Sequence, residues 1–198
     1  MKVYVVDNGG QWTHREWRVL KYLGVDTKIV PHDTSVASLQ AENVDGLVLS
    51  GGAPRVGLAD ALGNCGLYIE ALPVPIVGIC AGHQFMARHF GGEATPGGSE
   101  FGQATIKLHE PSPRDIFKGL PPESTAWESH HDEVSRVPKD FEVLASSEKC
   151  KVQAMRHRSR PLFGLQFHPE VEHTQFGATI FQNFLTICES HKKKALAR

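Results

Sequence analysis

Residues 74–84 read VPIVGICAGHQ, and this stretch predicts a buried strand, a sharp turn and the start of a helix. The apolar, β-branched run is typical of a strand, and the residues that follow predict a helix as far as Phe90. Between the two lies Cys80, with Gly78 and Gly82 two residues away on either side. A strained turn of this kind crowds its neighbours at those two positions, so glycine is favoured there.

The same stretch predicts a reactive thiol. The turn raises Cys80 above the edge of a sheet and places it at a helix N-terminus, where unpaired N–H groups favour a thiolate. A free cysteine with a pKa of about 8.5 is only slightly ionised at neutral pH, whereas such settings lower the pKa to roughly 3.5–7.5. The alternative is a buried structural cysteine beside two tight-turn glycines. We interpret Cys80 as a candidate nucleophile.

Length and composition narrow the class of protein. The 198 residues are enough for one domain with a substantial core. With 21 Lys and Arg against 22 Asp and Glu, the charge does not favour a nucleic-acid or anionic-membrane surface. The four cysteines form no CxxC pair, no signal peptide is recognisable, and no apolar run approaches the roughly 20 residues of a membrane span. We expect a cytoplasmic protein that acts on a small molecule.

Strand and helix patterns alternate over the first half of the chain. The β-branched runs at 2–6, 27–30 and 46–49 are each followed by a loop or helical pattern, and a helix is expected over 58–72. This alternation predicts an α/β fold, namely a three-layer, mainly parallel open sheet of the flavodoxin or Rossmann type with helices on both faces. In such sheets ligands bind beyond the C-terminal ends of the strands, where Cys80 is expected.

From about residue 91 the pattern changes to short alternating strands. Glycines punctuate the sequence around an alternating run at 104–108, and further short strands are expected at 143–145 and 152–155. Strands that follow one another without intervening helices favour antiparallel pairing. We therefore expect a small antiparallel extension of the parallel sheet.

The end of the chain predicts a helix and a basic tail. Apolar residues recur on one helical face over 175–189, and Lys192, Lys193 and Lys194 follow. We interpret the lysines as a solvated or frayed tail. The expected organisation is one domain over 1–190 and a basic C-terminal tail over 191–198.

A late motif supplies the partners that a cysteine nucleophile needs. A strand expected over 163–167 runs into His168-Pro169-Glu170. An imidazole can exchange protons with the thiol and the leaving group, and a nearby carboxylate fixes its tautomer and stabilises the imidazolium. A lone His-Pro-Glu is weak evidence, but here it follows a cysteine at a sharp turn. We predict that Cys80, His168 and Glu170 form a catalytic triad.

The loop Ser50-Gly51-Gly52 has two interpretations. Glycines after a buried strand let backbone N–H groups converge on an anion, either a phosphate or the oxyanion of a tetrahedral intermediate. The residues that follow, Ala53-Pro54-Arg55, match neither a Walker loop nor the Asp-Ser pair of an ATP-pyrophosphatase loop. We therefore favour an oxyanion hole whose donors are the backbone N–H groups of Gly52 and Ala81.

Three motifs in this order resemble the class I, or triad, glutamine amidotransferase family over nearly the whole chain. They lie at 50–52, 78–84 and 164–170. The resemblance implies a glutaminase: Cys80 attacks the side-chain amide of L-glutamine, ammonia leaves, and water releases glutamate from the thioester. It also implies that the amino-acid end of the substrate is held by Gln84, Ser129, His130, His131 and Asp132. One departure is Ala53, where the family usually has proline.

Further segments resemble one branch of this family, which aminates a purine nucleotide with a separate glutaminase subunit. These segments lie at 7–15, 100–104 and 129–134. The resemblance implies a separate ATP-pyrophosphatase (synthetase) subunit that receives the ammonia. It implies ATP and Mg²⁺ on that partner and no cofactor on this chain. The anthranilate and aminodeoxychorismate branches would show different residues at these positions.

Other classes of function stay open at this point. A glutaminase of another branch, or a cysteine hydrolase or chaperone-like protein of the same fold, is an alternative, although the last two would not need Gln84. An inactive regulatory module would be expected to lack one triad residue, and none is missing. A metal cluster at His130, His131 and Asp132 is disfavoured, because no matching cysteine or histidine spacing accompanies it.

Overall fold

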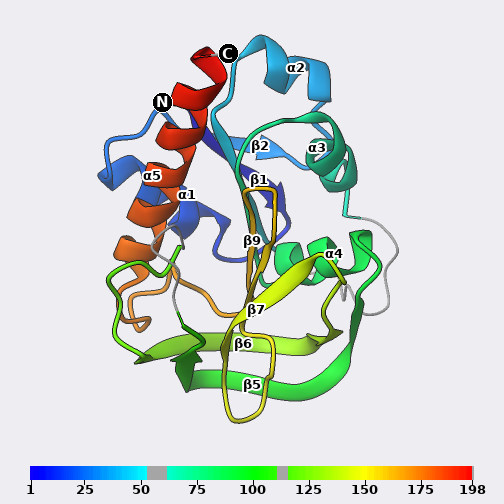
Figure 1. Cartoon of the computed structure of the whole chain (residues 1–198), viewed down its shortest axis with the longest axis vertical. Helices are drawn as coiled ribbons and strands as arrows, with labels where there is room; N and C mark the ends of the chain where they lie inside the picture. The colour runs from blue at the N-terminus through cyan, green and yellow to red at the C-terminus, as the bar shows by residue number, and fades with distance from the viewer. Residues whose placement is uncertain (53–61, 111–115, 198) are drawn as a thin grey trace.

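One sheet organises the chain, for which the computed structural model describes residues 1–52, 62–110 and 116–197. In the described residues its nine strands follow the order β2-β1-β3-β4-β9-β8-β7-β5-β6 (Figure 1). The parallel strands are β2 (Ile29–Pro31), β1 (Val3–Asn8), β3 (Gly46–Gly52), β4 (Ile76–Ile79) and β9 (Leu162–Leu165). The antiparallel strands are β8 (Ala154–His157), β7 (Phe141–Ser146), β5 (Glu93–Leu108) and β6 (Glu123–Arg136).

Helices cover both faces of the parallel half, as the sequence predicts (Figure 1). One face carries α1 (Thr13–Tyr22) and α5 (Gly177–Leu196), and the other carries α2 (Val36–Ala41), α3 (Cys65–Ala71) and α4 (Ala81–His89). Along β1, Val3 and Val5 pack in the first core, whereas Tyr4 and Val6 pack in the second. Successive side chains of a strand point to opposite faces, so a strand covered on both sides is apolar throughout.

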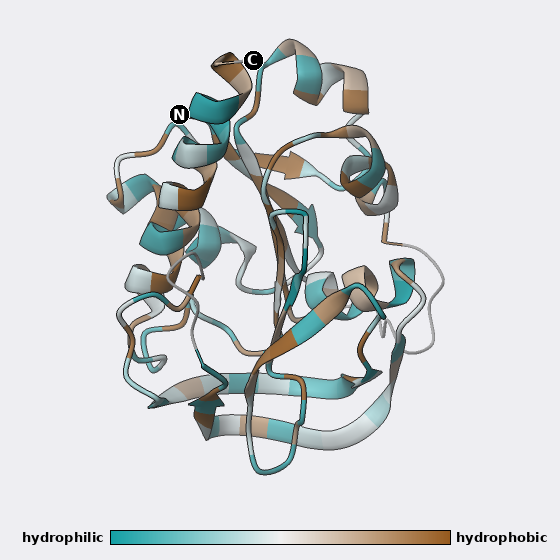
Figure 2. Cartoon of the chain, in the orientation of Figure 1, coloured by the Kyte–Doolittle hydropathy of each residue, from teal (hydrophilic) through white to brown (hydrophobic). Residues whose placement is uncertain are grey.

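The antiparallel part is larger than the small extension expected from the sequence. Four of the eight strand pairings are antiparallel, and the longest strands are β5, with 16 residues, and β6, with 14. The sequence analysis places only 104–108 on β5 and misses β6. The reason is that β6 buries Glu128, His130 and Asp132 at alternate positions, so its hydropathy does not alternate (Figure 2).

The ends of two helices differ from the expectation. Helix α5 continues to Leu196 rather than ending near residue 189, so the basic residues extend its last turns. Lys192 pairs with Asp45 at 3.0 Å, which ties these turns to the rest of the molecule. The division of the chain at residue 190 stays a prediction. Helix α3 begins at Cys65, and the start expected near residue 58 lies outside the described residues, as does the expected Ala53-Pro54-Arg55 segment.

Leucine truncation tests the packing of α1 on the sheet. Leu20 is fully buried between α1 and the sheet, whereas Leu67 on α3 is 56% exposed. We expect Leu20→Ala to lower the free energy of unfolding by about 2–5 kcal/mol, because it removes buried methyl groups and leaves a cavity. Leu67→Ala should change it by less than about 1 kcal/mol. Urea denaturation measures both, and equal losses would contradict this packing.

Candidate active site

Cys80 lies at the turn between β4 and α4, and its backbone is strained. Its φ is 48° and its ψ is −103°, a region that side chains other than glycine rarely adopt. A Cβ added at Gly78 would lie 2.5 Å from the carbonyl carbon of Gly82, and one added at Gly82 would lie 2.4 Å from the carbonyl oxygen of Leu49. The turn therefore has no room for side chains at either glycine, and the predicted strand–turn–helix unit is confirmed.

The surroundings of the thiol come from three elements. The Sγ atom of Cys80 donates to the carbonyl oxygen of Ser129 on β6 at 3.9 Å, and it accepts from Nε2 of Gln166 at 3.7 Å. The backbone N–H of Cys80 donates to the carbonyl of Leu165 on β9 at 2.7 Å. Helix α4 begins at Ala81, so the unpaired N–H groups of a helix N-terminus lie beside the sulfur.

His168 and Glu170 form a buried ion pair in the loop after β9. Nδ1 of His168 lies 2.7 Å from Oε1 of Glu170. Burial disfavours the imidazolium form, but the negative charge of Glu170 and the Cys80 side chain outweigh it and raise the pKa of His168 well above its ordinary value of 6.5. The other ring nitrogen, Nε2, has no hydrogen-bond partner among the described residues. It is therefore available for proton transfer.

A glycine brings the cysteine and the histidine together. A Cβ added at Gly51 would lie 3.3 Å from Cε1 of His168 and 3.7 Å from Cβ of Cys80, so both side chains meet over this residue. They line one cavity of about 270 Å³ at the C-terminal ends of the parallel strands, where the sequence predicts a ligand. Its lining residues are Gly9, Gly10, Gln11, Trp12, Thr13, Glu16, Gly51, Gly52, Cys80, Ser129 and His168.

The structure brings some of the predicted site residues together and not others. Ser129 lines the cavity, but Gln84, His130, His131 and Asp132 do not. Nε2 of Gln84 instead donates to the carbonyl of Asp132 at 2.5 Å, which links α4 to β6. The His130 ring is buried beside Glu100 and Glu128, and the His131 ring lies beside Phe101. The roles that the sequence assigns to these residues stay predictions.

Three residues at the site are missed by the sequence analysis. The Trp12 ring meets the His168 ring edge-on, with centroids 4.4 Å apart. Gln166 donates to the sulfur of Cys80, and Glu16 reaches the cavity from α1. A signal for Glu16 exists, because it lies one helical turn before Leu20 and so occupies the buried face of an amphipathic helix.

Glu16 is a buried carboxyl group in the wall of the cavity. It is 1% exposed, Oε1 accepts the backbone N–H of Gly51 at 3.3 Å, and Oε2 has no hydrogen-bond partner in the described part of the chain. Burial and then the negative charge of Glu170 raise the pKa of Glu16 well above its ordinary value of 4.5. The charge of His168 and the Gly51 hydrogen bond oppose this rise only in part.

The comparisons agree with this geometry. The family model for glutamine amidotransferase class-I matches residues 4–188, so the chain belongs to the class-I glutamine amidotransferase family. The glutamine-hydrolyzing subunit of GMP synthase from Thermoplasma volcanium is 52% identical over 99% of this chain and 96% of that protein. The corresponding protein from Archaeoglobus fulgidus is 48% identical over 96% of this chain and all of its own length.

A solved structure gives the same result for the fold. The crystal structure of a protein from Thermoplasma acidophilum, described as a subunit of GMP synthase, superposes with a TM-score of 0.91. It is 52% identical and covers 98% of this chain and 97% of its own. The family predicted from the three sequence motifs is therefore confirmed, and the protein is a glutamine amidotransferase.

Stability against pH tests the burial of Glu16. Below about pH 4.5 both the folded and the unfolded protein hold the proton. Above it the unfolded chain releases the proton first, because the pKa in the folded state is raised, so wild-type stability falls until the folded pKa is passed. We expect Glu16→Gln, which keeps an acceptor for Gly51, to remove this loss. Urea denaturation should show its advantage over wild type growing as pH rises from 4.5. The same change at exposed Glu148 should show no such trend.

Thiol labelling tests the exposure and reactivity of Cys80. Cys80 lines the cavity, whereas burial raises the pKa of Cys65 to about 12 and raises the pKa values of the Cys150 and Cys188 thiols as well. We expect iodoacetamide at neutral pH to modify Cys80 first and to leave the other three cysteines largely unmodified. Peptide mapping by mass spectrometry identifies the modified residue. Faster labelling of Cys65 would show that this assignment of reactivity is wrong.

Proposed function

We propose that this chain is the glutaminase subunit of a GMP synthase. It hydrolyses L-glutamine to glutamate and ammonia and supplies the ammonia to a separate synthetase subunit that aminates XMP to GMP. The observation that supports a glutaminase most directly is the meeting of Cys80 with the His168–Glu170 pair over Gly51, in one cavity. Support for the particular synthase comes from the names of relatives that match over nearly their whole length.

The first half of the proposed reaction releases ammonia. The thiolate of Cys80 attacks the side-chain amide carbon of glutamine, and the electron pair of the C=O bond moves to oxygen. The N–H groups of Gly52 and Ala81 stabilise this oxyanion, and loss of one such donor typically costs about 10²- to 10³-fold in rate. His168, held as imidazolium by Glu170, gives its Nε2 proton to the amide nitrogen. The C–N bond breaks, and ammonia leaves a thioester on Cys80.

The second half regenerates the enzyme. Neutral His168 takes a proton from water, and the resulting hydroxide attacks the thioester carbon. The C–S bond breaks, the thiolate of Cys80 departs beside the imidazolium of His168, and glutamate is released. Glu170 stays ionised throughout, because its role is to orient the imidazole and to stabilise its positive charge. The residues thus return to their starting protonation states.

The amino-acid end of glutamine is proposed to lie against β6. Ser129 lines the cavity, which supports a direct contact with the substrate. Gln84 and Asp132 are joined by a hydrogen bond behind this wall, so we assign them, with His130 and His131, to holding β6 in place for that contact. In this proposal Gln84 acts through the backbone of β6 rather than on the substrate.

The partner and the setting complete the proposal. A separate ATP-pyrophosphatase subunit would bind XMP, ATP and Mg²⁺, with no cofactor on this chain. A reducing cytoplasm suits a thiol nucleophile that must stay unoxidised. No helix within 1–52, 62–110 or 116–197 has the length and apolar character of a membrane span.

Reconstitution with the synthetase subunit tests the proposal. We expect the chain, the partner, XMP, ATP and Mg²⁺ to form GMP at the expense of glutamine. Cys80→Ala should abolish GMP formation from glutamine but keep GMP formation from added ammonia, because the second reaction needs only the partner. Chromatographic measurement of GMP and glutamate follows both. A complex that makes GMP from ammonia but never from glutamine would rule out this role for the chain.

The same assay tests control by the partner. A free glutaminase would release ammonia into water, so we expect the isolated chain to be slow. A partner that stabilises the competent arrangement by about 3 kcal/mol would raise glutamine turnover by roughly 10²-fold. If the chain alone turns over at the rate of the complex, control by the partner is wrong, although the cysteine chemistry would stand.

A further inference from the structure

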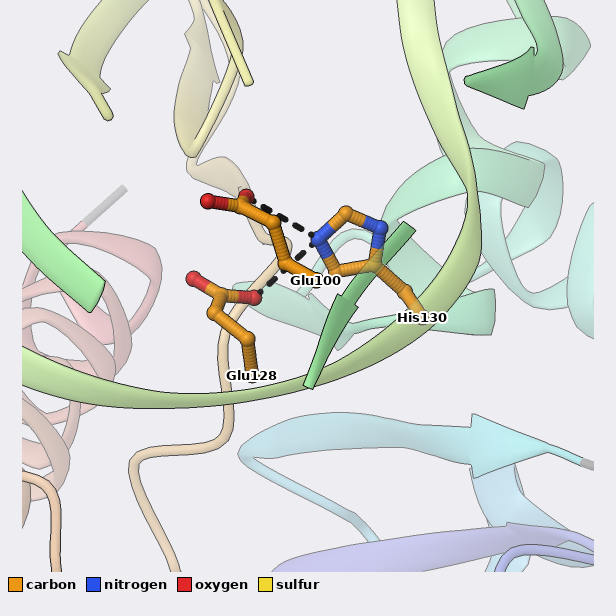
Figure 3. A group of neighbouring side chains, drawn as sticks. All are labelled: Glu100, Glu128 and His130. Carbon is orange, nitrogen blue, oxygen red and sulfur yellow. Dashed lines mark ion pairs between the residues drawn. The ribbon is translucent and has the colours of Figure 1, made fainter. Parts of the chain in front are cut away.

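Three ionisable side chains gather on one face of the β5–β6 pair, outside the walls of the catalytic cavity (Figure 3). Glu100 on β5 is the direct cross-strand partner of His130 on β6, and Glu128 lies two residues before His130. Residues at such positions point to the same face of a sheet. All three are buried, with exposed fractions of 6% for Glu100, 1% for Glu128 and 4% for His130. The strand register therefore fixes a three-residue cluster.

The atoms of this cluster have the spacing of metal ligands. Nε2 of His130 lies 3.3 Å from Oε2 of Glu100 and 3.3 Å from Oε2 of Glu128, and both carboxylates converge on this nitrogen (Figure 3). Neither contact has hydrogen-bond geometry. A zinc ion about 2.0–2.1 Å from tetrahedral ligands holds neighbouring ligand atoms about 3.3 Å apart. One donor atom from each residue lies within 4.8 Å of the others, so a single ion can reach all three.

The hydrogen bonds around the cluster orient one ligand and leave another without a partner. Both carboxylate oxygens of Glu100 accept from Oγ of Ser147, at 3.2 and 3.3 Å, and Oε2 also accepts from Nε2 of Gln153 at 3.0 Å. Such outer hydrogen bonds are typical of metal-ligating carboxylates. In contrast, both oxygens of Glu128 are buried without any hydrogen-bond partner among the described residues. A buried carboxylate in that condition is costly unless a cation balances it.

The charges require a cation of matching valence. Two carboxylates and an imidazolium leave one negative charge buried and uncompensated. Two carboxylates, a neutral imidazole and a divalent ion sum to zero. An imidazole among the ligands favours zinc or a similar transition metal over Mg²⁺, which prefers oxygen ligands in octahedral geometry. A cavity of about 720 Å³ that is lined by Glu100 and Glu128 provides an entry path and room for a water ligand.

We propose that Glu100, Glu128 and His130 form a binding site for a divalent transition metal ion, with zinc the best match. Spacing along the chain does not reveal this site, because Glu100 reaches the other two only through the β5–β6 register. The metal would also fix β6 where it meets the nucleophile. Ser129 lies between two of the ligands, and its carbonyl oxygen accepts the thiol of Cys80 at 3.9 Å. This site does not depend on the proposed GMP synthase function.

Zinc binding tests the site directly. The experiment uses chelator-treated full-length Cys80→Ala protein, so that the catalytic thiol cannot bind zinc. We expect equilibrium dialysis against Zn²⁺ to give one equivalent per chain, and Glu128→Gln and His130→Gln to weaken binding by more than about 10²-fold. Gln153→Ala, which removes a hydrogen bond to Glu100, should weaken it by about 10- to 10²-fold. The matched control is Glu123→Gln on the same strand, where an exposed carboxylate pairs with Lys107, and it should bind as the parent does.

Cobalt substitution gives a second measurement. Co²⁺ in the parent protein should give the intense visible absorption of a tetrahedral site, and Glu128→Gln should lose it while circular dichroism confirms that the variant is folded. If His130→Gln does not fold, Glu100→Gln takes its place. The proposal is overturned if the parent binds no stoichiometric Zn²⁺ at micromolar concentrations. It is equally overturned if folded Glu128→Gln binds Zn²⁺ as tightly as the parent.

Discussion

The backbone strain at Cys80 is the constraint on which the rest of the site depends. A non-glycine residue at φ 48° is unfavourable by itself, and it persists only because the structure around it leaves no alternative. Strand β4 is hydrogen-bonded to β3 on one side and to β9 on the other, and the helix that starts at Ala81 packs on these strands. The close approaches at Gly78 and Gly82 show how tightly the turn is enclosed. This enclosure holds the sulfur in one place.

The electrostatics of the cavity depend on the same placement. Since β4 and β9 are neighbours, the turn after β4 and the loop after β9 open at the same edge, and Cys80 and His168 meet there. Glu170 keeps the imidazole positively charged, and that charge lies beside a sulfur at a helix N-terminus. Glu16 adds a carboxyl group whose ionisation is suppressed by burial and by Glu170. One ionised carboxylate and one largely neutral carboxyl group therefore serve the same cavity.

Much of this arrangement could be predicted from the sequence, because it depends on local rules. The glycines around Cys80, the His168-Pro169-Glu170 motif and the apolar parallel strands each have a signature within about ten residues. Strand β6 has none, since its buried positions carry Glu128, His130 and Asp132 where a half-buried strand normally carries apolar residues. Contacts set by register over long separations, such as Glu100 with His130, also leave no periodic trace. For Glu16, the sequence shows a buried helical position but not the cavity it faces.

The curl of the sheet has a consequence for the order in which the protein becomes competent. Strand β6 is at one edge of the sheet, five places from β4, yet its Ser129 carbonyl accepts the thiol of Cys80 (Figure 1). The strand pairings from β4 to β6 must all form before that contact closes. Local contacts form early in folding and distant ones late, because closing long loops costs chain entropy. The nucleophilic turn can therefore be shaped while the chain is still partly unfolded, and the wall opposite the sulfur is the last part to arrive. Such a protein acquires its shape before it acquires its chemistry.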